Sequence, residues 1–126
     1  MKAMYPCGAS LPEDALSAFD PERARRHMGV DRAGFGRVFE HIWREVSERR
    51  TLIDVAWQAG DFKQIGLHAH TIKSAAATIG AEGLSRAAAT VEYAAEARDQ
   101  QALDAAMDAL RTARETLCRL VGMEPR

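Results

Sequence analysis

The residues best suited to chemistry in this sequence lie on one helical stripe centred on a histidine. Steps of three and four residues, which keep side chains on the same side of an α-helix, connect Lys63, Gly66, His70, Lys73, Ser74 and Ala77. Three of these neighbours are glycine, serine or alanine, too small to cover the imidazole. A free imidazole has a pKa near 6.5, so a large fraction is neutral and nucleophilic at pH 7. The stripe therefore predicts a nucleophilic histidine that another protein can reach.

Two charged residues are placed to assist that histidine. Lys73 follows His70 by one helical turn and can stabilise the negative charge of a phosphoryl group, whose transfer depends mainly on positioning and electrostatics. Glu92 lies twelve residues after Gly80, and His70 lies ten before it. In an antiparallel helical hairpin these positions are roughly 18 and 15 Å from the turn. Glu92 could thus bond the ring nitrogen that is not the nucleophile and fix the tautomer, or it could be an ordinary exposed acid.

The elements that carry these residues are expected to be helices throughout. No stretch alternates with a period of two, as a strand would. Apolar spacing and capping residues predict a short helix from Asp20-Pro21-Glu22 to Gly29, then long helices over about 31–59, 62–79, 81–97 and 100–121. Connections of two to four residues make the long helices antiparallel neighbours. The sequence predicts an all-α, up-down-up-down four-helix bundle over residues 20–122, with tails at 1–19 and 123–126.

The core of this bundle is expected from the apolar stripe of each long helix. The tryptophans Trp43 and Trp57 are expected to pack the bundle or its flank. The stripes comprise Phe35, Val38, Phe39, Ile42, Val46, Ile53 and Ala56; Phe62, Ile65, Ala69, Ile72, Ala76 and Ile79; Leu84, Ala88, Val91 and Ala95; and Leu103, Ala106, Leu110, Ala113, Leu117 and Leu120.

Composition excludes several classes of protein. The 126 residues are 47% hydrophobic and 28% charged, which suits one globular domain. Seventeen basic and eighteen acidic residues give a net charge of -1, so no nucleic-acid partner is expected. No apolar run is long enough for a membrane span or a signal peptide, so a cytoplasmic protein is expected. A monomer is expected, because the bundle needs no partner to bury its core. Cys7 and Cys118 do not have the spacing of metal ligands, and the sequence does not decide whether a disulfide joins them.

The run from His70 to Gly80, His-Thr-Ile-Lys-Ser-Ala-Ala-Ala-Thr-Ile-Gly, resembles the signature of histidine-containing phosphotransfer (HPt) domains. That signature has His-x-Leu-Lys-Gly, small residues, and a glycine ten positions after the histidine. The later Val91-Glu92 pair resembles the family's Leu-Glu or Leu-Gln, and the resemblance covers about residues 19–121. The sequence departs from the signature where Ser74 replaces glycine and Ile72 replaces leucine. The serine adds bulk one turn from the histidine, which puts rate and partner choice in question.

The resemblance implies a four-helix bundle that is phosphorylated on His70 and exchanges the phosphoryl group with an aspartate of a response-regulator receiver domain. A hybrid sensor histidine kinase is the expected upstream partner. No cofactor belongs to the chain itself, whereas Mg²⁺ is expected on the partner receiver during transfer. Gly66, Ser74, Ala77 and Lys63 are expected to form the partner-binding surface, although a solvated charge also explains Lys63.

Other interpretations of the same residues have less support in the sequence. His68 and His70 form a His-x-His pair, but residues two apart on a helix project about 200° apart and cannot easily share a metal ion. No glycine-rich phosphate loop is present, so the chain is not expected to be a kinase or another enzyme. The alternative function is a helical module that binds a kinase or a receiver and regulates it without carrying phosphate.

Overall fold

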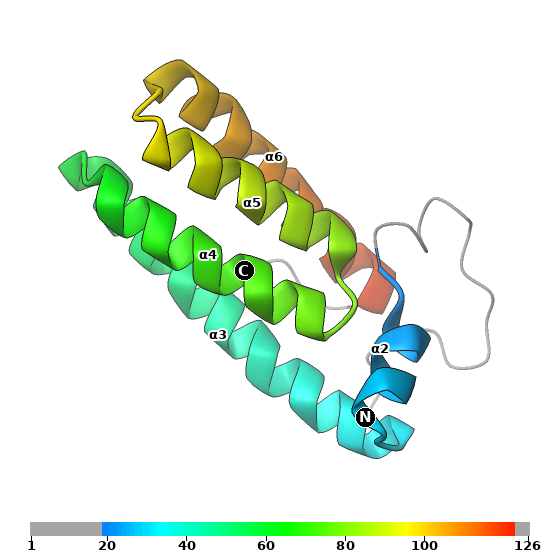
Figure 1. Cartoon of the computed structure of the whole chain (residues 1–126). Helices are drawn as coiled ribbons and strands as arrows, with labels where there is room; N and C mark the ends of the chain where they lie inside the picture. The colour runs from blue at the N-terminus through cyan, green and yellow to red at the C-terminus, as the bar shows by residue number, and fades with distance from the viewer. Residues whose placement is uncertain (1–18, 123–126) are drawn as a thin grey trace.

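The computed structural model describes residues 19–122, which form helices joined by short turns (Figure 1). The helices are α2 (Pro21–Met28), α3 (Arg32–Ala59), α4 (Phe62–Thr78), α5 (Glu82–Glu96) and α6 (Gln100–Val121). No strand occurs within this described range, and the predicted all-α fold with a short N-terminal helix is confirmed. The expected tails fall almost entirely outside it, at residues 1–18 and 123–126.

Aspartate caps explain why four of the five helices begin where they do. Asp20, Asp31, Asp61 and Asp99 each accept a hydrogen bond from the backbone N–H three residues further on, at 2.7 to 3.1 Å. Helix α5 has no such cap, because Ala81 precedes it. Its bounds lie one residue inside the predicted 81–97, and α4 ends at Thr78 instead of Ile79.

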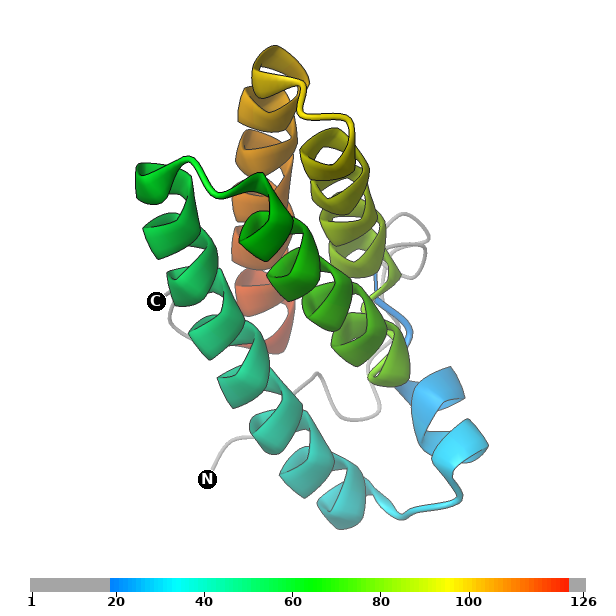
Figure 2. The same cartoon turned by 60° about the vertical axis from the view of Figure 1, so that its left-hand side comes forward.

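The four long helices run alternately up and down, as expected (Figure 2). Helix α4 lies between α3 and α5, and α6 packs on α5 (Figure 1). The short α2 crosses the end of the bundle at which α4 turns into α5. One helix, α4, therefore carries the His70 stripe along the middle of an exposed face, with α5 on one side and α3 on the other.

Aromatic residues fill the core at the α2 end of the bundle. The rings of Phe39 and Trp43 stack with centroids 6.1 Å apart, and Phe19 meets Phe39 edge-on at 6.0 Å. Phe19 falls in the predicted N-terminal tail, yet its side chain is fully buried. The core therefore begins one residue before the predicted boundary, because the chain enters the bundle through this ring.

The apolar stripes are largely buried as expected, with two departures. Five of the predicted residues are only half-buried, namely Val38, Ile42, Phe62, Ala113 and Leu120. Trp43 is buried, in agreement with its expected packing in the bundle. Arg114 is buried too, and its guanidinium lies 5.4 Å from the centre of the Trp43 ring, a cation–π distance. A helix in a bundle touches two neighbours, so its buried surface is wider than one stripe and can include an amphipathic side chain.

The turn between α4 and α5 is fastened to the start of α2. The backbone N–H of Asp20 donates to the carbonyl oxygen of Gly80 at 2.8 Å. Gly80 has a φ of +78°, a left-handed conformation that strains other residues. A Cβ at this position would also collide with the backbone carbonyl of Asp20. Glycine is therefore required twice, once for the turn and once for the contact with α2.

This double requirement predicts a large loss of stability in Gly80→Ala. The left-handed conformation costs about 1–2 kcal/mol, and the collision with Asp20 raises the total to about 2–4 kcal/mol. Gly60→Ala is the matched control, because Gly60 also has a positive φ, of +67°, but nothing lies within 4 Å of its missing Cβ. Urea unfolding of both variants measures the difference. Equal losses would show that the contact between Gly80 and Asp20 does not matter.

Candidate functional site

A carboxylate joins the histidine and the lysine at the centre of the predicted site. Oε2 of Glu92 lies 2.9 Å from Nδ1 of His70, and Oε1 of the same carboxylate lies 2.9 Å from Nζ of Lys73. The Glu92 side chain is 18% exposed, whereas that of His70 is 57% exposed. The structure thus brings together the three residues predicted to act in the site, with the histidine outermost.

Close packing of α4 on α5 allows a glutamate to reach across. The facing positions include Gly66 and Ala95, where a Cβ added to the glycine would lie 3.7 Å from the alanine Cβ. Further along, the hydroxyl of Ser85 donates to the backbone carbonyl of Lys73 at 2.9 Å. This partly buried hydrogen bond joins α5 to the turn of α4 that carries Lys73. Together these contacts hold Glu92 at the height of His70.

The electrostatics of Glu92 keep it ionised near neutral pH. Burial on its own raises the pKa of the Glu92 carboxyl, but hydrogen bonds from Lys73 and His70 outweigh burial. The positive charge of Lys73 acts in the same direction, so the net pKa is lowered below its usual value. Glu92 is therefore a carboxylate when the imidazole is neutral.

An ionised carboxylate can only accept hydrogen bonds, and this decides the tautomer of the neutral histidine. Nδ1 of His70 must carry the proton that it donates to Glu92. The lone pair is then on Nε2, on the side of the ring away from α5. A half-exposed imidazole with its free lone pair turned outward can attack an electrophile carried by another molecule.

The small residues predicted around His70 lie on the outer surface of α4. Ser74, Ala77 and Lys63 are exposed, and Gly66 is half-buried where α4 faces α5. A shallow hollow beside His70 is lined by Gly66 and Ala95 at its base, with Lys63 on its rim. The expected open approach to the imidazole is thus present in the described structure.

Two exposed apolar side chains flank the histidine and were missed in the sequence. Leu67, one turn before His70, is 51% exposed, and Tyr93, next to Glu92 on α5, is 76% exposed. Their positions away from the core stripes could have revealed them, because an apolar residue there contributes nothing to the core. Large exposed apolar residues beside a reactive group favour a contact surface for another protein.

His68 is on a different side of α4 from His70, as the helical spacing required. Its Nδ1 lies 3.1 Å from the Arg49 guanidinium on α3. Burial, and then the charge of Arg49, lower the pKa of His68. Since arginine only donates, His68 is a neutral acceptor that helps to join α3 to α4. No cluster of three or more potential metal ligands occurs among residues 19–122.

The lowered pKa of His68 predicts a loss of stability in mild acid. In the unfolded chain the His68 imidazole has a pKa of about 6.5, so it binds a proton at a higher pH than it does in the folded protein. The free energy of unfolding therefore falls as the pH drops from 7 towards 5. Thermal melts of the wild type and His68→Gln across this range measure the effect. The wild-type midpoint should fall more steeply than that of the variant, which lacks the His68 imidazole. If the melting temperatures of the two proteins fell equally with pH, His68 would not contribute to the pH dependence of stability.

A comparison with protein-family models identifies the family of this chain. The model described as the Hpt domain matches residues 37–119, which is most of α3 to α6 and includes His70, Lys73 and Glu92. The chain belongs to the Hpt domain family. Hpt domains serve histidine phosphotransfer in phosphorelays, and they are phosphocarriers that interact with kinases and receiver domains. No curated protein and no solved structure matches the chain.

The match begins after the first residues of α3, so the short helix α2 lies outside the matched part of this Hpt domain, whereas the α4–α5 turn that it contacts lies inside. None of the helices described between residues 19 and 122 is both long and apolar enough to cross a membrane.

Proposed function

We propose that this Hpt domain accepts a phosphoryl group on Nε2 of His70 and exchanges it with an aspartate of a receiver domain. The observation that carries the proposal is the hydrogen bond from Nδ1 of His70 to Glu92, which leaves the outward Nε2 as the nucleophile. The small residues on α4 give a second protein access to that atom.

In the proposed transfer the Nε2 lone pair attacks the phosphorus of an aspartyl phosphate. The N–P bond forms as the P–O bond to the aspartate breaks, and its electron pair returns to the aspartate carboxylate. The ring gains positive charge as it is phosphorylated, and Glu92 stabilises that charge through Nδ1–H. Lys73 supplies positive charge one turn away for the phosphoryl oxygens. The reverse steps return the group to an aspartate.

The proposed partners are response-regulator receiver domains and a hybrid sensor histidine kinase. The chain acts as a cytoplasmic monomer that lacks a kinase activity of its own, and Mg²⁺ is supplied by the receiver site. Leu67 and Tyr93 extend the proposed contact surface beyond Gly66, Ser74, Ala77 and Lys63. Their apolar area favours a protein partner, which can bury it, over a small phosphate donor.

The test is transfer from a phosphorylated receiver domain carrying radioactive phosphate. The label should appear on this chain, be lost in acid and persist in base, as a phosphohistidine requires. Phosphorus–nitrogen couplings in NMR should assign it to Nε2. If the chain binds a receiver yet never takes the label, the regulatory module is the correct function and the carrier proposal is wrong.

The position of Lys73 predicts a slower transfer in Lys73→Ala. Loss of its charge should lower the single-turnover rate about fivefold, since exposed charge stabilisation amounts to roughly 1 kcal/mol. The fold should lose no more than about 1 kcal/mol, because the ion pair with Glu92 is partly exposed. Lys63→Ala is the control, since it removes the same charge from the same stripe about three turns before Lys73. An equal loss in both variants would mean that Lys73 acts only through general charge.

A further inference from the structure

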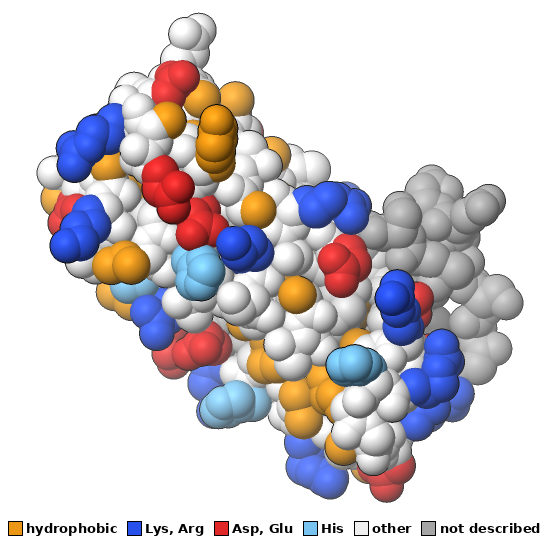
Figure 3. Space-filling view, viewed as in Figure 1, with side chains coloured by type: hydrophobic (Ala, Val, Ile, Leu, Met, Phe, Trp, Pro, Cys, Tyr) orange, Lys and Arg blue, Asp and Glu red, His pale blue; other side chains and the backbone are white. Residues whose placement is uncertain are grey.

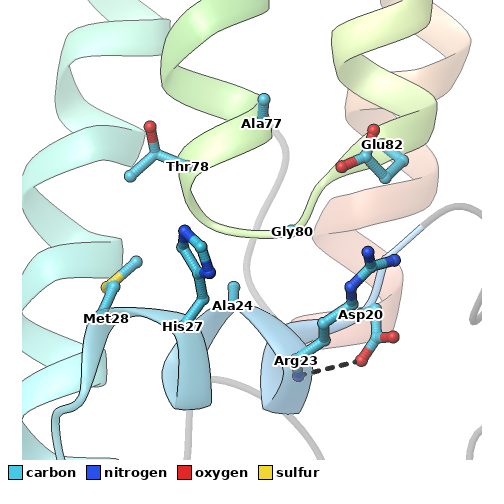
Figure 4. A pocket seen from close by; sticks show the side chains of 9 residues that line it. All are labelled: Asp20, Arg23, Ala24, His27, Met28, Ala77, Thr78, Gly80 and Glu82. Atoms are coloured by element: carbon cyan, nitrogen blue, oxygen red, sulfur yellow. Dashed lines mark hydrogen bonds between the residues drawn. The ribbon is translucent and has the colours of Figure 1, made fainter.

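A second hollow on the His70 face lies where α2 meets the α4–α5 turn. It has a volume of about 760 Å³ and is open to solvent. Ala77 and Thr78 of α4 form one wall, and Ala24, His27 and Met28 of α2 form the other. Figure 4 shows the His27 ring rising from α2 towards Thr78 across this opening. The hollow therefore separates α2 from the end of the stripe that carries His70, and we call it the α2 cleft.

The outer side of α2 is positively charged. Arg23, Arg26 and His27 are exposed, and none of them forms an ion pair with any part of the chain between residues 19 and 122. The glutamate of this helix, Glu22, instead pairs with Arg25 at 3.0 Å and with Arg32 at 3.2 Å. Figure 3 shows blue and pale-blue side chains gathered over α2. This concentration contrasts with the net charge of -1 for the whole chain.

The cleft also contains two carboxylates, which limit where an anionic partner could lie. The side chain of Asp20 accepts the Arg23 backbone N–H at 3.1 Å, so it faces the first turn of α2. Glu82 is on the opposite wall, at the start of α5. An acidic partner would therefore lie along the outer edge of α2 and contact the apolar Ala24, Met28 and Ala77 in the cleft.

The α2 cleft is within reach of any domain that docks on His70. Ala77 lines the cleft and is also seven residues after His70, which is about 10 Å along α4. A domain of about 100 residues has a radius of gyration near 13 Å. A receiver domain placed with its aspartate over Nε2 of His70 would thus also cover Ala77 and meet the charged edge of α2.

We infer that the outer edge of α2 and the α2 cleft form a second contact for the receiver domain, and that they take an acidic segment of its surface. This inference rests on the proposed function, because the partner is the receiver that exchanges phosphate with His70. The contact at His70 performs the chemistry, while α2 attracts and orients partners whose surface is negative beside the aspartate. Electrostatic contacts of this kind change encounter and selection more than the chemical step.

The test reverses charge on α2 without touching the site. Arg23→Glu with Arg26→Glu changes two exposed side chains, and Arg111→Glu with Arg119→Glu makes the same change of charge on exposed positions of α6. The probe is the labelled receiver domain that transfers phosphate fastest to the wild-type chain in a panel of receivers. Circular dichroism and thermal melts check that both double variants are folded.

The α2 variant should lose about tenfold or more in kcat/KM at low salt, while kcat at saturating receiver stays within about twofold. The loss should shrink at high salt, because exposed charges are screened. The α6 variant should stay within about threefold of the wild type. If the wild type takes the label and both double variants transfer alike, the α2 inference is wrong and the proposed function stands. If the wild type takes no label from any receiver, the proposed function fails and the inference fails with it.

Discussion

His70→Gln is expected to take up no acid-labile phosphate from a receiver that phosphorylates the wild type. Glutamine has no nucleophilic nitrogen, because the lone pair of an amide nitrogen is delocalised into the carbonyl group. The fold should survive, since the His70 side chain is more than half exposed and packs on Glu92 through one hydrogen bond. The expected result is complete loss of label with unchanged helical content, measured by gel autoradiography and circular dichroism on the same sample.

His68→Gln is the matched control for this experiment. It makes the same substitution two residues away on α4, at a side chain that contacts Arg49 instead of Glu92. The control should carry phosphate at close to the wild-type level. Label on His70→Gln, or loss of label in both variants, would contradict the assignment of the phosphate to His70.

Ser74→Leu is expected to block transfer while the protein stays folded. Ser74 is exposed one turn after His70, so a leucine there adds apolar bulk over the approach to Nε2 but displaces nothing in the core. We expect the single-turnover rate to fall by at least about a hundredfold, because displacement of the partner by about 1 Å already costs this much. Leucine is also a better helix former than serine, so the melting temperature should not fall.

Ser74→Gly separates bulk from the chemistry of the hydroxyl group. Glycine restores the family pattern and should leave transfer equal or faster, with a loss of stability below about 1 kcal/mol. Slow transfer in this variant would show that the hydroxyl takes part in the reaction. Fast transfer in Ser74→Leu would mean that the receiver does not approach over this stripe, and a different docking face would be required.

Much of this architecture is local in origin, which is why the sequence predicted it. The caps at Asp20, Asp61 and Asp99 act on the next turn of their own helix, so their effect needs no knowledge of the rest of the fold. The stripe around His70 follows from helix periodicity alone. The prediction that Glu92 and His70 lie at a similar height required only that α4 and α5 form an antiparallel hairpin.

What the sequence did not predict depends on how helices are rotated and spaced against one another. The sequence assigned Lys73 to the phosphoryl group and Glu92 to the imidazole, but not the ion pair between these two residues. That pair exists because small residues let α4 and α5 approach closely. The burial of Arg114 similarly depends on the Trp43 ring facing it from another helix. The role of Phe19 depends on α2 crossing the end of the bundle, which no local pattern records.

The contact between Gly80 and Asp20 affects what the family signature can show about the evolution of related proteins. The signature combines a histidine with a glycine ten positions later, but in this chain the two residues are required for different reasons. The histidine is exposed, whereas the glycine is imposed by a backbone conformation and by its contact with Asp20. A descendant could lose the histidine, keep the glycine and still form the same bundle. Paralogues that retain only the glycine would then be inherited scaffolds without phosphotransfer, and counting them as carriers would overestimate the number of relays in a genome.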